Sequence, residues 1–450
     1  MITIPEITPV YRTAKPNDVI DLYDGPAKLE LEGQIQTGHA SIKFEWLPSP
    51  RVHLYSNDLH INHREFFDCS YHDAILHLRD FSMNVQVAFG GTIEIVASDV
   101  SAQKVIGRVR AKSYVDLRSD LTYVIFHLVN FHELMGSGIT TESRSRLGRA
   151  SAEAEGWRLI IDTVENFDDL IDAVNNETGY VITHAAKLEK VDGSTFDAAQ
   201  VSELIDELLR FFSFARGFFS PPILPVGFDP NGKRVWEDWR VLRSSSMQGA
   251  QSWFSDRQYV NRNLEQSLSG FLKLWRNPAW TETLKLSIHY YTESNTNAGG
   301  IEGSIILAQV AIEMLAASFL IENGYLSPDG YEKLPAAERI RLTLSIMKIP
   351  VEIPAHLTEL GVIAKAENWK TGPYALVDMR NTFVHVTPKN QTKSLRFSWL
   401  AKFQMLQVAL SYIELSLLYI LGYQGTYVNR LRRDLIKGVT EIVPWGLAKP

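Results

Sequence analysis

The pattern of hydrophobic and polar positions divides the 450-residue chain into two parts. In the first part, short runs rich in β-branched and aromatic residues lie between Gly, Asp, Asn and Pro clusters, and several runs alternate with period two. The clearest runs cover residues 27–35, 40–47, 91–98, 104–111, 121–131 and 156–164. Such strands have one apolar face, so we expect a β-rich region over residues 1–250, built as a sandwich of packed sheets.

Helical spacing replaces this alternation further along the chain. Apolar residues recur at intervals of three and four from about residue 196 to 217, before a Pro-Pro pair, which predicts a helix within the first region. Further helices are predicted at 259–276, 301–323, 335–347, 372–386 and 397–421. We therefore expect an α+β chain in which residues 251–450 form an all-α bundle, with the boundary near residue 250.

Composition describes an ordinary globular protein, with 45% hydrophobic and 22% charged residues. The formal net charge of -7 argues against a protein that coats nucleic acid, but it leaves room for a local basic groove. Cys69 is the only cysteine, which excludes an intrachain disulfide and fits a reducing cytoplasm. The N-terminal residues carry acids and prolines in place of a signal-peptide pattern, so we expect a cytoplasmic protein.

Two apolar stretches, residues 301–322 and 398–421, are long enough to raise the question of a membrane. Glu313 interrupts the first stretch, and Lys402 and Glu414 interrupt the second. Because charged side chains are rare in the middle of a membrane span, we expect buried core helices and no membrane contact.

Residues 377–389, VDMRNTFVHVTPK, combine an apolar helix with an unusual set of polar side chains. At 100° per residue, one arc of the helix is apolar. Its members are Leu376, Val377, Met379, Phe383, Val384 and Val386. Asp378, Asn381 and His385 share a narrow polar strip. Arg380 falls within the apolar arc, where a guanidinium needs a carboxylate, a backbone carbonyl or a subunit boundary.

The end of this helix follows from Pro388, which disfavours a helical conformation at Thr387. The helix should therefore end near Val386, with His385 in its last turn. Histidine titrates near neutral pH and arginine can clamp a phosphate, so the group is a plausible acid/base site. The alternative interpretation is a buried arginine and a satisfied histidine that close an ordinary core helix.

The six residues Arg380 to His385, RNTFVH, match the R-N-x-x-x-H signature of the HEPN superfamily, and the surrounding helix order resembles it as well. The matching segments are the long apolar helix at 304–324, the short segment at 337–349 and the closing helix at 403–421. The resemblance covers roughly residues 260 to 440. A large β-rich region in front of such a domain looks most like the Apea-like group of defence proteins.

This resemblance implies a metal-independent endoribonuclease without a cofactor, whose cleft forms between two protomers, in antiphage defence or toxin-like growth arrest. His385 would move a proton as the ribose 2′-hydroxyl attacks the adjacent phosphate, and Arg380 would stabilise charge on the phosphoryl oxygens. Asn381 would position His385 or the phosphate. RNA is then the substrate because it supplies the 2′-hydroxyl. The resemblance also allows a catalytically inactive module that dimerises and binds a nucleotide or protein. A phage-derived or other protein trigger would act on the β-rich region.

Several further side chains are weaker candidates. Basic residues that could line an RNA groove are Lys389, Lys393, Arg396, Arg430 and Arg433. Glu313 and Asp378 are candidate supporting acids. Trp236 and Trp239 stand between basic residues and could stack bases, although such a strand more often buries its tryptophans. For all of these, a solvated face or a structural ion pair is the alternative.

The first half also contains a histidine-rich stretch. His60-x-x-His63 and Cys69-x-x-His72 imitate a four-ligand zinc pattern, and His53 and His77 lie nearby. The spacer between the two pairs is very short and matches no standard zinc finger. We therefore expect surface or half-buried histidines and no metal site.

Overall fold

The computed structural model describes residues 5–59, 71–79, 82–89, 105–111, 120–140, 145–255, 257, 259–385, 387–433 and 439–446. The chain forms two compact units. Unit 1 comprises Met1–Leu209 and Ser220–Gln248, and unit 2 comprises Arg210–Phe219 and Gly249–Pro450. Helix α3 (Ala198–Arg216), predicted from its spacing, therefore contributes its first turns to unit 1 and its last turns to unit 2.

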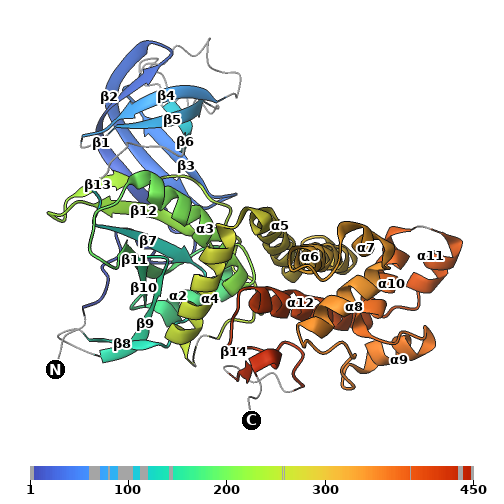
Figure 1. The fold of residues 1–450 in the computed structure, drawn as a ribbon. Helices are drawn as coiled ribbons and strands as arrows, with labels where there is room; N and C mark the ends of the chain where they lie inside the picture. Colours follow the sequence, from blue (N-terminus) through green and yellow to red (C-terminus); the bar gives the residue numbers. More distant parts are fainter. Residues whose placement is uncertain are drawn as a thin grey trace. The chain divides into compact units, whose positions relative to one another are not determined.

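The first part of unit 1 is a closed barrel of six strands, drawn in blue in Figure 1. The strands are β1 (Ile20–Leu31), β2 (Gln34–Glu45), β3 (Arg51–Ser56), β4 (His72–His77), β5 (Ser82–Phe89) and β6 (Val105–Ala111). Their order is β1-β2-β3-β6-β5-β4, and antiparallel pairing of β1 with β4 closes the barrel. Along β1 and β3, buried and more exposed side chains alternate. Leu29, Val52 and Leu54 are among the buried ones and belong to the core of the barrel.

A closed barrel followed by an open sheet replaces the expected sandwich. Period-two alternation correctly predicts strands with one buried face, but it does not reveal which strands pair. Here Leu29 pairs with Leu76, so the first and fourth strands meet and leave the barrel no free edge. The predicted strand at 91–98 lies outside the described residues.

The rest of unit 1 is an antiparallel seven-stranded sheet with the order β13-β12-β7-β11-β10-β9-β8. Its strands are β7 (Tyr123–Val129), β8 (Ser137–Thr140), β9 (Ser145–Ala154), β10 (Trp157–Thr163), β11 (Ile182–Lys190), β12 (Pro222–Phe228) and β13 (Arg234–Glu237). Helix α2 (Phe167–Glu177), which was not predicted, connects β10 to β11 and buries Leu170 and Val174.

Residues 5–18, which we call the N-terminal strap, lie against this sheet. The backbone N–H of Tyr11 donates to Nε2 of His127 (3.1 Å), and the Tyr11 hydroxyl donates to Glu237 (2.7 Å). Beyond the strap, the ring of Trp46 stacks on Tyr180, with 5.1 Å between centroids. The barrel interior and the adjoining part of the sheet therefore share one apolar core.

Unit 2 is mainly helical. Its helices are α4 (Val260–Trp275), α5 (Pro278–Asn295), α6 (Gly300–Glu322), α7 (Pro328–Lys333), α8 (Ala336–Ile346), α9 (Thr358–Ala366), α10 (Gly372–Val384), α11 (Pro388–Ser394) and α12 (Trp399–Ile420). A two-stranded ribbon, β14 (Thr426–Tyr427) and β15 (Glu441–Ile442), and a 3-10 turn (Pro444–Gly446) follow. The five helices predicted in this half are confirmed to within about two residues, whereas α5, α7, α9 and α11 were not predicted. Helix α6 packs against both α5 and α12, and α10 packs against α6, α8 and α12.

Helices α6 and α12 are the two described helices that are long and apolar enough to cross a membrane. In α12, 78% of the most apolar window is buried within the protein, and in α6 the share is 56%. The charged Glu414 of α12 is itself buried and binds Arg430. The apolar window of α12 is therefore mostly covered by the rest of the protein, and that of α6 about half covered.

Candidate functional site

The motif lies at the C-terminal end of α10. The helix ends at Val384, and His385 adopts an extended conformation (φ -98°, ψ 94°) as the capping residue. Thr387 is also extended and caps α11, whose first residue is Pro388. The predicted effect of Pro388 is therefore confirmed, with the helix ending two residues earlier than expected, and Val386 lies outside the described residues.

Only one side of α10 is deeply buried. Ala375, Leu376 and Met379 have no exposed surface, and Thr382 is 5% exposed. Val384, expected to widen the apolar arc, is instead 40% exposed. The last turn of the helix leaves the core, because the neighbouring helices cover only the face centred on Leu376 and Met379. The motif consequently reaches solvent.

Arg380 is half-buried at the edge of this face. One terminal nitrogen of its guanidinium donates to Oδ1 of Asn381 (3.1 Å). Its Nε is buried without a hydrogen-bond partner, and none of the carboxylates in the described part of the chain lies within ion-pair distance. The acidic partner that a buried arginine needs is therefore not found among the described residues.

His385, four positions after Asn381, is exposed. Its backbone N–H donates to the Asn381 carbonyl (3.0 Å), and its carbonyl accepts from the Asn390 side chain (2.7 Å) and from the Thr387 N–H (3.0 Å). These bonds hold the turn between α10 and α11. Among the described residues none bonds to the imidazole, so the ring is available to a ligand.

Lys393 does not line a groove, which corrects the prediction from sequence. Its side chain is 9% exposed, and its Nζ lies 2.5 Å from Asp378 and 3.0 Å from Glu367. Trp369 also donates to Asp378 (2.5 Å), and Arg396 pairs with Glu367 (3.1 Å). The ion pair between Asp378 and Lys393 therefore connects α10 to α11. The partner of Asp378 is this lysine and not His385.

Arg430 is likewise structural and not part of an RNA groove. It is 5% exposed and binds Glu414 through Nε (2.9 Å) and Nη2 (2.5 Å). The Tyr291 hydroxyl donates to the same carboxylate (2.5 Å). Burial, together with the Glu414 charge, raises the pKa of Tyr291 well above its usual value, which keeps the hydroxyl neutral. The sequence shows an arginine close to other basic residues but not this buried partner.

The remaining basic and acidic candidates are scattered. Lys389 and Arg433 are exposed, and Arg396 keeps a 60% exposed side chain beside its carboxylate partner. Glu313 is half-buried on α6 and accepts a hydrogen bond from Gln309 (2.7 Å), and it forms no ion pair with Arg380. Of these candidates, Lys389 and Arg396 lie nearest to the motif in the sequence.

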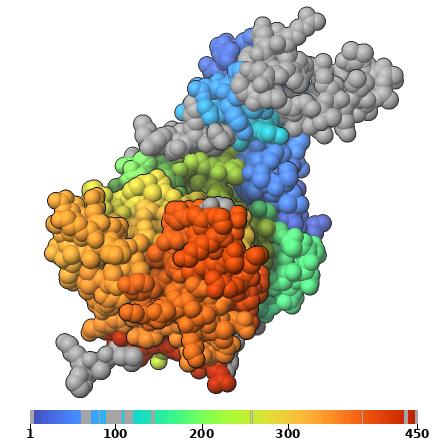
Figure 2. All heavy atoms as spheres, turned by 90° about the vertical axis from the view of Figure 1, so that its right-hand side faces the viewer, coloured from blue at the N-terminus to red at the C-terminus, as the bar shows by residue number. Residues whose placement is uncertain are grey.

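An exposed apolar surface, which the sequence analysis missed, adjoins the motif. Trp399 and Phe403, 64% and 38% exposed, stack at 5.3 Å on the first turns of α12. Lys402 lies between these two residues in the sequence. Its Nζ is 5.9 Å from the centre of the Phe383 ring of α10 and forms an ion pair with Glu302 (2.6 Å). Further exposed members of this flank, which we call the apolar flank, are Val384, Leu395 and Leu400. The sequence signal for this surface is the pair Trp399 and Phe403, which are four positions apart directly after the helix cap Ser398. Figure 2 looks onto the side that carries α9 and α11.

The candidate tryptophans and histidines of the first half, where the structure describes them, are buried or paired with acidic residues. Trp236 and Trp239 are 3% and 1% exposed, so neither can stack a base. His72 pairs with Glu32 (3.1 Å), and His53 pairs with Glu45 (3.0 Å). His60, His63 and Cys69 lie outside the described residues. Within the described ranges, no three His, Cys, Asp or Glu side chains gather as a metal site would require.

The structure therefore defines a mixed α/β chain, with a closed barrel and an antiparallel sheet before a helical unit that exposes an Arg-Asn-His motif. Residues 116–250 match the YopA central domain family, and residues 277–442 match the YopA C-terminal domain family. The chain is 26% identical over 438 residues to the SPbeta prophage-derived uncharacterized protein YopA of Bacillus subtilis (strain 168), covering 95% of both proteins. No solved structure matches the chain.

Each of the two matched ranges covers a different part of the fold. The first spans the seven-stranded sheet, and the second spans α5 to α12 with the motif. Neither includes the barrel, whose last strand ends at Ala111. Neither family description names HEPN, so the HEPN resemblance of RNTFVH stays a prediction.

Proposed function

We propose that unit 2 is a metal-independent endoribonuclease of the HEPN type, with Arg380, Asn381 and His385 as its catalytic residues. The observations that carry the proposal are the exposed side chain of His385 and, five positions earlier in the sequence, an arginine that has no acidic partner among the described residues. A structural arginine would be expected to pair with a carboxylate, as Arg430 does.

The chemistry proposed for each residue is the one that the HEPN resemblance implies. His385 accepts the proton of the ribose 2′-hydroxyl, and the oxygen then attacks the adjacent phosphorus to form a 2′,3′-cyclic phosphate. The bond from phosphorus to the 5′-oxygen breaks, and this oxygen takes a proton from water and leaves as a hydroxyl. Arg380 stabilises the charge that develops on the phosphoryl oxygens. Asn381 holds the guanidinium at 3.1 Å and so fixes its direction. RNA is the substrate because DNA lacks the attacking hydroxyl.

The proposed site is completed by a second copy of the chain. Arg380 is half-buried on α10, whereas His385 follows the last residue of this helix in an extended conformation and is exposed. In a dimer, the arginine of one protomer can meet the histidine of the other. The apolar flank supports this arrangement, since large exposed apolar side chains beside a motif are typical of protein interfaces.

The biological role in this proposal is conflict between phage and host, either antiphage defence or toxin-like growth arrest in the cytoplasm. It rests on the HEPN resemblance and on the relative's description as prophage-derived. In this proposal, a phage-derived or other protein trigger binds unit 1 and controls cleavage. The rival function is an inactive module that dimerises and binds a nucleotide or a protein.

The proposal is tested by incubating total cellular RNA with the purified protein in EDTA. Wild-type protein should produce discrete fragments, whereas Arg380→Ala and His385→Ala should leave the RNA intact. His356→Ala, which removes another exposed histidine of unit 2, should cut as the wild type does. Cleavage that survives in both motif variants would remove these residues from the mechanism, and intact RNA with wild type would favour the inactive module.

A further inference from the structure

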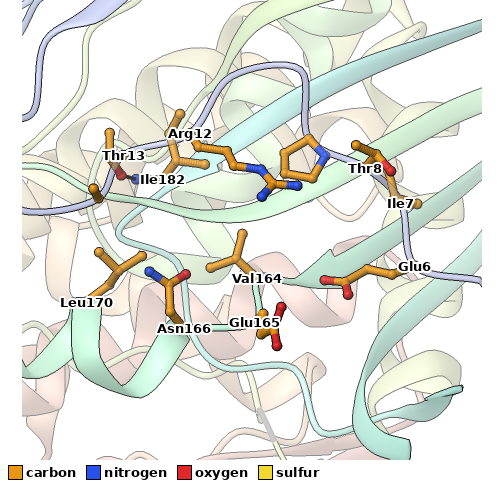
Figure 3. A pocket seen from close by; sticks show the side chains of 12 residues that line it. Glu6, Ile7, Thr8, Arg12, Thr13, Val164, Glu165, Asn166, Leu170 and Ile182 are labelled. Carbon is orange, nitrogen blue, oxygen red and sulfur yellow. Dashed lines mark hydrogen bonds between the residues drawn. The ribbon is translucent and has the colours of Figure 1, made fainter. Parts of the chain in front are cut away.

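Unit 1 contains a cavity of about 360 Å³ between the N-terminal strap and the connection from β10 to α2 (Figure 3). Strap residues between positions 6 and 14 line one side, and the other side is formed by Val164, Glu165, Asn166, Leu170 and Ile182. A cavity of this volume is in the range that holds a small organic molecule. The nuclease site proposed in unit 2 uses none of these residues.

The base of the cavity is apolar. Leu170 and Ile182 are 2% and 1% exposed, and the half-buried Val164 completes this floor. In Figure 3 these three side chains come from the start of α2, from β11 and from the loop between β10 and α2. An apolar part of a ligand that contacts this floor is removed from water, which favours binding.

The two acidic side chains of the lining already have partners. Nη2 of Arg146 lies 2.8 Å from the carboxylate of Glu6 and neutralises its charge. Glu165 also has an interaction partner. The cavity therefore does not present an unpaired carboxylate to a ligand.

The guanidinium of Arg12 is the charged group of the lining that remains unpaired. It forms no ion pair and no side-chain hydrogen bond within the described part of the chain. In Figure 3 its side chain extends from the strap above Val164. Thr8 and Asn166 add a hydroxyl and an amide to the lining, and both groups can donate hydrogen bonds. The polar part of the cavity is therefore suited to an anion with oxygen acceptors.

The strap is held on both sides of Arg12, so the cavity is formed before a ligand arrives. On one side, the N–H of Ile7 donates to the carboxylate of Asp162 (2.8 Å). On the other side, the N–H of Ile182 donates to the Thr13 hydroxyl (2.9 Å). A preformed wall lowers the entropy lost on binding.

We propose that this cavity binds an aliphatic monocarboxylate. The carboxylate pairs with Arg12, whose planar guanidinium matches two carboxylate oxygens, and the aliphatic chain contacts Leu170 and Ile182. A cation would meet the like charge of Arg12. Inorganic phosphate has no apolar part to place on the floor, and a neutral hydrocarbon leaves the guanidinium unpaired. A monocarboxylate with an aliphatic chain matches the single free charge and the apolar floor together.

The test is calorimetric titration of the full chain with hexanoate, octanoate and 4-methylpentanoate. At least one of them should bind with one molecule per chain. The primary amide of that acid, which has the same shape without the charge, should bind at least about tenfold more weakly. Acetate, which lacks the aliphatic chain, should show a loss of at least about the same size. Equal affinity for the amide or for acetate would overturn the proposal, as would no binding by any of the three acids.

A pair of variants assigns the binding to this cavity. Arg12→Gln should weaken binding of the acid by at least about tenfold. Lys15→Gln removes the same charge from a strap residue outside the lining and should leave the affinity unchanged. Both positions are exposed, so the fold should survive, which the melting temperature checks. Unchanged affinity in a folded Arg12→Gln protein would place the ligand elsewhere and contradict the proposal.

Discussion

The guanidinium of Arg380 donates to the side chain of Asn381 at 3.1 Å, and its Nε is buried without a partner. Arg430, a candidate arginine that is deeply buried, instead has a carboxylate on two of its nitrogens. The positive charge of Arg380 is therefore not neutralised within the described chain. A phosphate, like a carboxylate, offers two oxygens that match the planar guanidinium.

Substitution of Arg380 by lysine should separate the effect of the positive charge from the effect of the planar guanidinium shape. Arg380→Lys keeps the positive charge but loses the planar fork, so we expect the cleavage rate to fall by roughly 10²-fold. The urea midpoint should stay the same, because no ion pair within the described chain is lost. Single-turnover cleavage and urea titration measure the two effects. A lysine variant that cuts at the wild-type rate would exclude bidentate phosphate contact.

A composite dimer site predicts complementation between two inactive variants. When Arg380→Ala and His385→Ala proteins are mixed after dissociation and reassociation, about half of the dimers are mixed, and each mixed dimer has one intact site of two. Cleavage should therefore recover to roughly one quarter of the wild-type rate. If each site lay within one protomer, the mixture would stay as inactive as either variant.

The apolar flank should control the same dimer. Leu395 is 87% exposed, so Leu395→Glu should not disturb the fold of one protomer but should place charge in the proposed interface. We expect sedimentation to shift from dimer to monomer and cleavage to be lost with it. The matched control is Val362→Glu, at another exposed apolar residue on α9. A Leu395→Glu protein that remains dimeric would place the interface elsewhere.

The Arg430 pair should contribute to folding and not to RNA binding. Arg430→Met leaves the Glu414 carboxylate buried without its cation, so we expect unit 2 to lose about 3 to 5 kcal/mol of unfolding free energy. Arg433→Met, at an exposed position, should change stability little. Urea denaturation measures both. A stable Arg430→Met protein with weaker RNA binding would restore this arginine to the substrate groove.

Two buried histidines of unit 1 predict how stability depends on pH. Burial lowers the pKa of His127 to about 4 and that of His184 to about 3. The ordinary histidine pKa near 6.5 applies in the unfolded chain, so between pH 6.5 and about 4 the unfolded chain binds more protons than the folded one. Stability is then fully present above pH 7 and falls on acidification, by about 2 kcal/mol per histidine at pH 5.

Replacement of one histidine isolates this effect. His184→Gln should lose about 2 kcal/mol less than the wild type between pH 7.5 and pH 5. Hydrogen exchange of the β7 and β11 amides reports the local free energy of opening. Equal losses in the two proteins would show that His184 does not set the acid sensitivity of this sheet.

The strands and long helices were predictable because each carries its own periodic signal. Strand β1 alternates buried and exposed positions, and α10 places Leu376 and Met379 on one face. Closure of the barrel was not predictable, because it depends on the pairing of Leu29 with Leu76. Helix α5 was missed among its many polar residues, although Asn277 as a cap and Pro278 at the first position mark its start.

The candidate site was predictable only where local sequence decides the structure. Pro388 ends α10 and leaves His385 at its end, as expected. The roles of Lys393 and Arg430 depend on partners from other elements, Glu367 and Glu414. A basic residue near a motif looks the same in sequence whether it faces RNA or a buried carboxylate.

The most direct measurement is mass spectrometry of the ends of a single-stranded RNA after incubation with the protein in EDTA. We predict 2′,3′-cyclic phosphate and 5′-hydroxyl ends with wild type and with His356→Ala, and intact RNA with His385→Ala. The same ends from His385→Ala, or intact RNA from the wild type, would contradict the proposed ribonuclease.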